Sequence, residues 1–261
     1  MTTIPTVDLN CDFGEGYGAY TFGQDAELLQ YVTSVNIACG FHAGDPHTMR
    51  QAVDYSISAG VAIGAHPGLP DRLGFGRREM SVTPAEVYDF TLYQVGALSA
   101  FVRAAGGRLR HVKPHGALYH MAGRDGAIAD AIVQAAAVID RGLIIFAQSG
   151  SMLIDAAKRE GLTTASEVFA DRAYERDGSL VSRGNPGAVL QDIEAVAKQA
   201  CAMVVQGVAY SVHGEEVAVQ SDTICLHGDG PHATLFAARI REALSAQGVQ
   251  LQPPSSLIMG I

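Results

Sequence analysis

The chain has 261 residues, of which 48% are hydrophobic and 17% charged, and its formal net charge is -9. This composition is typical of a globular protein and excludes a disordered chain. Lysine and arginine are scattered, whereas a nucleic-acid-binding protein needs a basic patch that neutralises phosphates. No apolar run approaches the ~20 residues of a membrane-spanning helix, and the N-terminus does not resemble a signal peptide. We therefore expect a cytoplasmic protein with neither nucleic acid nor membrane as partner.

Short apolar runs alternate with helical patterns along nearly the whole chain. Most of these runs are followed by Gly, Pro or Asp, which is typical of strands that end in turns. The expected strands span residues 7–11, 35–40, 61–66, 110–115, 143–148, 164–169 and 223–227. Helix start signals occur at Asp45-Pro46, at the capping box Thr83-Pro84-Ala85-Glu86 and at Asn185-Pro186. These three helices are expected to end before Gly60, Gly106 and Gly207.

Repeated strand–helix units predict a parallel sheet with right-handed crossovers. Seven units fit either an open doubly wound sheet or a closed barrel, and the pattern alone does not decide between them. The absence of a dinucleotide-binding glycine fingerprint disfavours the open sheet. Because no linker-like stretch interrupts the pattern, residues 1–261 are expected to form one domain, a (β/α) barrel with seven strands.

The four cysteines lie in apolar runs and form no CxxC pair. A cysteine in such a run behaves as a small hydrophobic side chain. We expect buried, reduced thiols at Cys11, Cys39, Cys201 and Cys225.

Polar residues follow the two-residue period of several expected strands and gather toward their C-terminal ends. Asp8, Asn10 and Asp12 share one face of the first strand. Buried parallel strands are normally apolar on both faces, and barrel enzymes carry their active sites at the C-terminal ends of the strands. Capping of the next helix explains a single such residue as well as catalysis does, but not the whole set. The set comprises Asp12, His42, His66, Lys113, His115, His227 and Asp229.

Six segments closely resemble the LamB/YcsF family and cover nearly the whole chain in the order of that family. They are DLNCDFGEGYG (8–18), NIACGFHAGDP (36–46), GAHPGLPDRLGFGRR (64–78), VKPHGALY (112–119), EVFADRAYERDGSLVSR (167–183) and LHGDGPHA (226–233). The resemblance implies an incomplete βα barrel of the glycoside hydrolase/deacetylase type. It also implies the A subunit of an ATP-dependent 5-oxoprolinase, which opens the lactam of 5-oxo-L-proline to give L-glutamate.

The resemblance further implies two partners, the B and C subunits of the same 5-oxoprolinase. ATP would then be a co-substrate of the complex. The chain contains no GxxxxGK[ST] phosphate-binding loop, so ATP is expected to bind largely to the partner subunits.

Lactam hydrolysis needs a base for water, an acid for the leaving nitrogen and a cation for the developing negative charge. The candidates are Asp12 and His66 for the base, His115 or His227 for the acid, and Lys113 for the cation. Guanidinium groups bind carboxylates through two hydrogen bonds, so the carboxylate of the substrate suits Arg77, Arg78 or Arg183. Further candidates for substrate binding are Asn10, His42 and Asp229.

Two other functions remain open. Related deacetylases bind a metal through an Asp on the first strand and two His one helical turn apart. Asp12, His42 and His47 correspond to these ligands, but the two histidines are five residues apart and Pro46 intervenes, so a divalent metal is possible but not favoured. The alternatives are therefore a metal-dependent carbohydrate deacetylase and a non-catalytic binding subunit. The number of polar side chains that share one face of the expected strands favours a catalytic subunit over a non-catalytic one.

Overall fold

A closed barrel of seven parallel strands forms the centre of the computed structural model, which describes residues 4–20, 25–226 and 233–254. The strands are β1 (Thr6–Phe13), β2 (Ser34–Ala38), β3 (Ala62–His66), β4 (Leu109–Val112), β5 (Ile144–Gln148), β6 (Thr163–Phe169) and β9 (Thr223–Leu226). Each pairs with the next in this order, and β9 pairs with both β6 and β1. The predicted seven-stranded barrel is thus confirmed, and its ring is closed.

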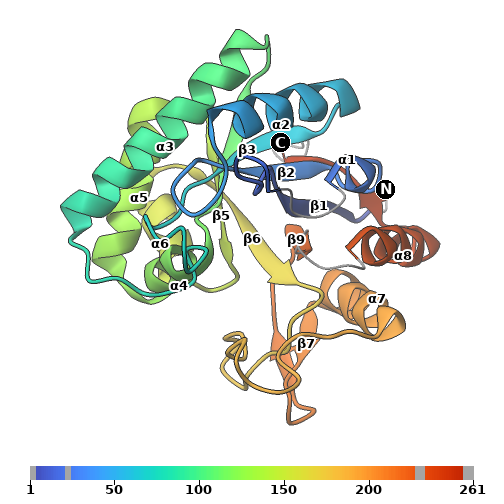
Figure 1. Cartoon of the computed structure of the whole chain (residues 1–261). Coiled ribbons are helices and arrows are strands. Elements are labelled where there is room, and N and C mark those ends of the chain that lie inside the picture. The colour runs from blue at the N-terminus through green and yellow to red at the C-terminus, as the bar shows by residue number, and fades with distance from the viewer. Residues whose placement is uncertain (1–3, 21–24, 227–232, 255–261) are drawn as a thin grey trace.

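Helices cover the outside of the barrel (Figure 1). They are α1 (Asp25–Leu28), α2 (Pro46–Ala59), α3 (Pro84–Ala104), α4 (Gly116–Arg124), α5 (Gly126–Ile139), α6 (Met152–Glu160), α7 (Ile193–Cys201) and α8 (Ala233–Ala246), with a π-helical turn η1 (Ala202–Gln206). The short strand β10 (Gln250–Leu251) pairs with the start of β1. β7 (Val208–Tyr210) and β8 (Glu216–Ala218) form an antiparallel hairpin. Together with the loop 170–192, this hairpin forms an arm that extends from the barrel at the foot of Figure 1.

Two of the three predicted helix starts are confirmed. The Asp45 side chain accepts hydrogen bonds from backbone N–H groups at the start of α2, and the capping box at Thr83 opens α3. The start at Asn185-Pro186 is wrong, because α7 begins at Ile193 with Asp192 as its N-cap. The preceding segment is engaged elsewhere: the backbone N–H of Ala173 donates to the carbonyl of Ala188, and Arg172 and Val189 form an antiparallel bridge.

The two faces of the barrel strands differ in polarity, as the two-residue period predicts. Leu9 and Cys11 of β1 point outward into the hydrophobic core beneath the helices. Asp8, Asn10 and Asp12 of the same strand make their hydrogen bonds inside the barrel. Space in the interior is limited: a Cβ atom on Gly64 would lie 2.0 Å from Nε2 of His111. The absence of a side chain at Gly64 therefore makes room for the imidazole ring.

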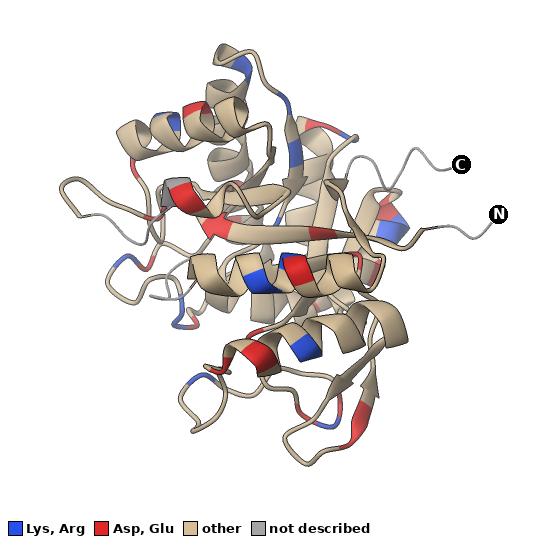
Figure 2. Cartoon of the chain, turned by 90° about the vertical axis from the view of Figure 1, so that its right-hand side faces the viewer, with Lys and Arg blue, Asp and Glu red and all other residues tan. Residues whose placement is uncertain are grey.

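The thiol prediction is confirmed for three of the four cysteines. All four are free; Cys11, Cys39 and Cys225 are buried, whereas Cys201 is partly exposed. Acidic and basic residues are interspersed on the face shown in Figure 2. Among the described residues, no helix combines the length and apolarity needed to cross a membrane.

Asp8 lies at the centre of a buried group of polar side chains near the N-terminal end of the barrel. Its carboxylate accepts hydrogen bonds from the hydroxyls of Thr33, Ser34 and Thr223 at 2.6, 2.8 and 2.5 Å. Burial nevertheless raises the pKa of Asp8 from 3.8 to about 6, and the nearby Glu167 adds to the effect while the three hydroxyls oppose it. The charged carboxylate is thus less favourable in the folded protein than in the unfolded chain.

This shift predicts a pH-dependent contribution of Asp8 to stability. Because the pKa of Asp8 is higher in the folded protein, its protonated carboxyl favours folding. This contribution to stability is complete below pH ~4 and is lost as pH rises through about 6. Two pKa units correspond to about 3 kcal/mol. The free energy of unfolding of Asp8→Asn, minus that of the parent, should therefore rise by up to about 3 kcal/mol between pH ~4 and ~7, as measured by urea unfolding. Asp89→Asn, at an exposed position, controls for the substitution itself, and a flat difference for Asp8→Asn contradicts the prediction.

Candidate functional site

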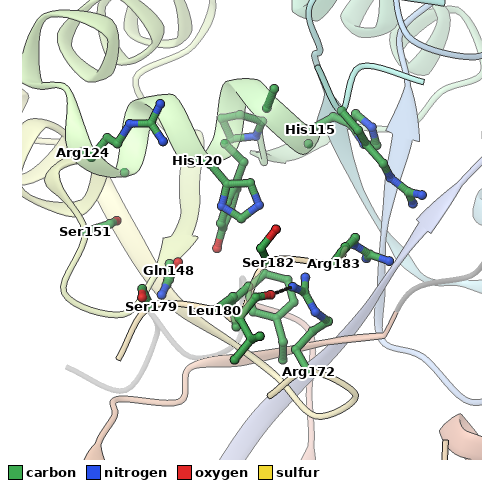
Figure 3. A pocket seen from close by; sticks show the side chains of 18 of the residues that line it. His115, His120, Arg124, Gln148, Ser151, Arg172, Ser179, Leu180, Ser182 and Arg183 are labelled. Carbon is green, nitrogen blue, oxygen red and sulfur yellow. Dashed lines mark hydrogen bonds between the residues drawn. The ribbon is translucent and has the colours of Figure 1, made fainter. Parts of the chain in front are cut away.

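A cavity of about 760 Å³ opens at the C-terminal ends of the barrel strands. Asp12 is the next-to-last residue of β1, His66 ends β3, and Lys113 directly follows β4; all three line the floor of this cavity. Residues of α4 and of the loop after β6 line its walls (Figure 3). The cavity thus lies where barrel folds carry their active sites.

Lys113 is the central charge of the cavity floor. Its Nζ lies 3.2 Å from Oδ1 of Asp12, 2.9 Å from Oε1 of Glu167 and 2.9 Å from Sγ of Cys225. Burial by itself would lower the pKa of Lys113, but Asp12, Cys225 and Glu167 together raise it well above the ordinary value. The lysine is therefore a fixed positive charge.

Two asparagines hold this charge cluster in place. Asn10 donates to Oε1 of Glu167 at 3.0 Å and to Thr223, and its Oδ1 accepts from Asn36 and from Lys113. Asn36 also donates to Oδ1 of Asp12 at 3.0 Å. Asn10 is fully buried and lies below the cavity. Its contacts suit positioning of the charged groups better than direct contact with a substrate.

His111 completes this layer from β4. Its Nε2 lies 2.8 Å from Oδ1 of Asn36, and its ring stacks on Phe146 at 4.0 Å. Burial, followed by the charge of Lys113, lowers the pKa of His111 to about 3. The neutral ring is thus part of the interior packing.

Three histidines and a glutamate gather beside the cavity floor. Nε2 of His66 lies 2.9 Å from Nδ1 of His115 and 3.3 Å from Oδ1 of Asp12. His42 stacks on His115 with ring centroids 3.7 Å apart and planes nearly parallel. Oε1 of Glu15 lies 3.5 Å from Nε2 of His42 and 3.7 Å from Nδ1 of His115. Burial, and then the neighbouring histidines, lower the pKa of His42 and that of His115 well below the ordinary value.

Basic side chains outnumber the carboxylates of Glu79 and Asp177 along the outer part of the cavity. His120 and Arg124 come from α4, and Arg172 and Arg183 come from the loop after β6 (Figure 3). Arg172 is buried and donates to the carbonyls of Val181 and Ala188; burial, followed by the charge of Arg183, lowers its pKa to about 10. A cavity bordered by several cations attracts anionic ligands.

The structure brings most of the sequence-predicted site residues to one place. Those that line the cavity are Asp12, His66, Arg77, Lys113, His115 and Arg183. Arg78 pairs with Asp71 instead. His227 and Asp229 lie outside the described residues. The individual roles of all these residues remain predictions.

The metal set suggested by analogy with deacetylases does not form, because His47 is exposed and contacts Arg50.

Two acidic site residues were missed from the sequence. Glu167 is in phase with the last residue of β6, so the two-residue period could have identified it. Glu15 lies in the loop after β1, where that period does not apply.

Comparisons with known proteins agree with this geometry. The model of the LamB/YcsF family matches residues 7–259. A protein of Geobacillus kaustophilus, named as the A subunit of 5-oxoprolinase, is 55% identical over 249 residues, which is 95% of this chain and 97% of that protein. The lactam utilization protein of Thermus thermophilus is 47% identical with a TM-score of 0.90, over 95% of this chain and 99% of that one.

A more distant solved structure, a T48 deacetylase, shares only the fold. It is 14% identical with a TM-score of 0.50, over 98% of this chain and 92% of that one. The matched length and the level of identity to the nearer relatives leave one assignment: the chain belongs to the LamB/YcsF family.

Proposed function

We propose that this chain is the A subunit of a 5-oxoprolinase, a hydrolase that opens the cyclic amide of 5-oxo-L-proline to give L-glutamate. The names of its relatives support this proposal. The observation that carries it is the pairing of the Lys113 ammonium with the Asp12 carboxylate, 3.2 Å apart, on the floor of a cavity with a cationic rim. Such a site combines a proton acceptor and a fixed positive charge with recognition of a small anion.

The chemistry requires activation of the amide before water attacks. An amide is a poor electrophile, and transfer of the γ-phosphoryl group of ATP to the lactam oxygen releases ADP and makes the ring carbon more electrophilic. Water then adds to this carbon, the ring C–N bond breaks and the nitrogen takes up a proton, which leaves an acyl phosphate. A second water releases inorganic phosphate and the carboxylate of glutamate.

We assign the hydrolytic part of this sequence to the barrel. Asp12 accepts the proton of the attacking water, and His66 lies within contact of the same carboxylate. Lys113 stabilises the negative charge that develops on oxygen. His115 is poorly placed as the acid, because its Nε2–H is held by the carbonyl of Phe75 at 2.7 Å. His227, which directly follows β9 in the sequence, is therefore the candidate acid.

The cationic rim would bind the anionic groups of the substrate. Arg77 and Arg183 are assigned to the carboxylate of 5-oxoproline and to the transferred phosphate, since guanidinium matches both geometrically. The sequence has no P-loop, so we place the phosphorylation step on the B and C subunits, in a cytoplasmic complex.

Reconstitution tests the proposed function. The chain mixed with its B and C subunits, 5-oxo-L-proline and ATP should release glutamate and phosphate, and omission of any one of the three proteins should abolish release. The isolated chain should show no ATPase activity. Strong ATP turnover by the purified chain contradicts the division of labour. Release of acetate from an acetylated oligosaccharide by the chain alone supports a deacetylase instead.

Asp12→Asn tests the base. It replaces a carboxylate by an amide of similar volume, and loss of a proton-transfer group typically lowers the rate about 10²–10⁴-fold. We expect such a loss of glutamate release in the reconstituted complex, with near-native circular dichroism and thermal unfolding that still shows one cooperative transition. The exposed variant Asp54→Asn should retain parental turnover. Turnover of Asp12→Asn within threefold of the parent refutes the assignment.

A further inference from the structure

Four buried side chains direct ligand atoms toward one point beside the cavity floor. They are Glu15, His42, His66 and His115, and their ligand atoms all lie within 4.8 Å of one another. Glu15 follows β1, His66 ends β3, and His115 immediately precedes α4. The closed barrel thus brings together four potential ligands that are dispersed in the sequence.

Backbone contacts fix which nitrogen of two of these rings carries its hydrogen. Nδ1 of His66 lies 2.7 Å from the carbonyl oxygen of Lys113, and Nε2 of His115 lies 2.7 Å from that of Phe75. A carbonyl oxygen only accepts hydrogen bonds, so both of these nitrogens are donors. In the neutral rings the remaining nitrogens, 2.9 Å apart, both present lone pairs. Two facing lone pairs repel unless a cation lies between or beside them.

His42 shows a second, independent need for a partner. Its side chain is 1% exposed, and neither ring nitrogen makes a hydrogen bond to the described residues. Nδ1 faces the backbone of Gly68, where a Cβ atom would lie only 2.5 Å away. Nε2 faces Glu15 at 3.5 Å, beyond hydrogen-bonding distance for this pair. Buried polar atoms almost always have partners, so the Nε2 side of the ring, which faces Glu15, is the side suited to bind a ligand.

We propose that Glu15, His42, His66 and His115 bind one divalent transition-metal ion, for which zinc is the best match. Three imidazole nitrogens and one carboxylate oxygen suit zinc, whereas magnesium and calcium prefer oxygen ligands. The hydrogen bonds from His66 and His115 to backbone carbonyls are of the kind that orients metal-binding histidines. Ligand atoms of a tetrahedral zinc ion lie about 3.3–3.6 Å apart, so closing this set from separations of up to 4.8 Å needs side-chain shifts on the order of 1 Å.

An ion at this point would lie beside the charged floor of the cavity. His66 and His115 line the cavity, and Oδ1 of Asp12 is 3.3 Å from Nε2 of His66. Bound zinc lowers the pKa of its water and polarises carbonyl groups. Use of this chemistry on a lactam rests on the proposed function, but binding of the ion does not.

Zinc binding by the intact chain, without substrate or partner subunits, tests the inference. The chain is stripped with EDTA, incubated with Zn²⁺ and desalted, and its zinc content is measured by mass spectrometry; affinity is measured by calorimetry. We expect one zinc ion per parent chain and a zinc-dependent rise in melting temperature. His42→Gln and Glu15→Gln should each weaken binding by at least about 100-fold, because loss of an outer partner alone costs 10–100-fold.

His47→Gln is the matched control, because this histidine is exposed and its ring contacts Arg50 rather than the cluster. It should keep parental zinc affinity. Two ligand variants are used because one of them could fail to fold, which circular dichroism detects. The zinc affinity of the other variant then still tests the proposal. A parent chain that retains no zinc overturns the proposal and favours a proton shared between His66 and His115. Equal zinc retention by the parent, His42→Gln and Glu15→Gln also overturns it. Neither result depends on glutamate release.

Discussion

Burying an ammonium group inside a protein costs several kcal/mol unless charged and polar partners surround it. Lys113 is in this situation, and Asp12, Glu167, Asn10 and Cys225 provide the partners. These partners come from β1, β6 and β9, so contacts to one side chain after β4 connect four of the seven strands across the interior. A shift of one residue in the register of any of them would turn its partner outward into the apolar layer. The buried charge therefore supports both the closed ring and the site above it.

The same constraint limits what mutations of this site can reveal. Removal of Lys113 alone would leave Asp12 and Glu167 buried without their shared counter-ion, and breaking a buried pair in this way typically costs about 3–5 kcal/mol. Loss of activity in such a variant would not separate catalysis from folding. Asp12 is the better probe, because Glu167 remains 2.9 Å from the lysine after the carboxylate of Asp12 is replaced.

Much of the barrel could be predicted because its determinants are local or periodic. Short apolar runs indicated the seven strands, and the two-residue period placed Asp12 and Lys113 in the interior. The cluster of Glu15 with the histidines depends on contacts that no local pattern contains. His115 receives its orientation from Phe75, 40 residues earlier in the chain, and His66 receives its orientation from the carbonyl of Lys113, 47 residues later. The direction of each lone pair, which decides what the cluster can bind, follows only from those long-range contacts.

The one wrong helix start and the arginines that the arm contributes to the cationic rim have a common cause. Asn185-Pro186 is a good local start signal, but the segment 170–192 folds into the arm instead. Tyr174 anchors the beginning of the arm by accepting a hydrogen bond from the backbone N–H of Phe169 at the end of β6. Arg172 then binds the carbonyls of Val181 and Ala188.

These hydrogen bonds keep the backbone irregular up to Asp192, and they also hold the arm against the mouth of the cavity, where Arg183 lies. The chain thus separates two tasks. The strand ends carry the groups suited to chemistry, whereas the elements around the mouth, the arm with Arg183 among them, carry the groups suited to binding an anion. Variation in the arm can therefore alter ligand recognition while the charge network in the barrel stays intact.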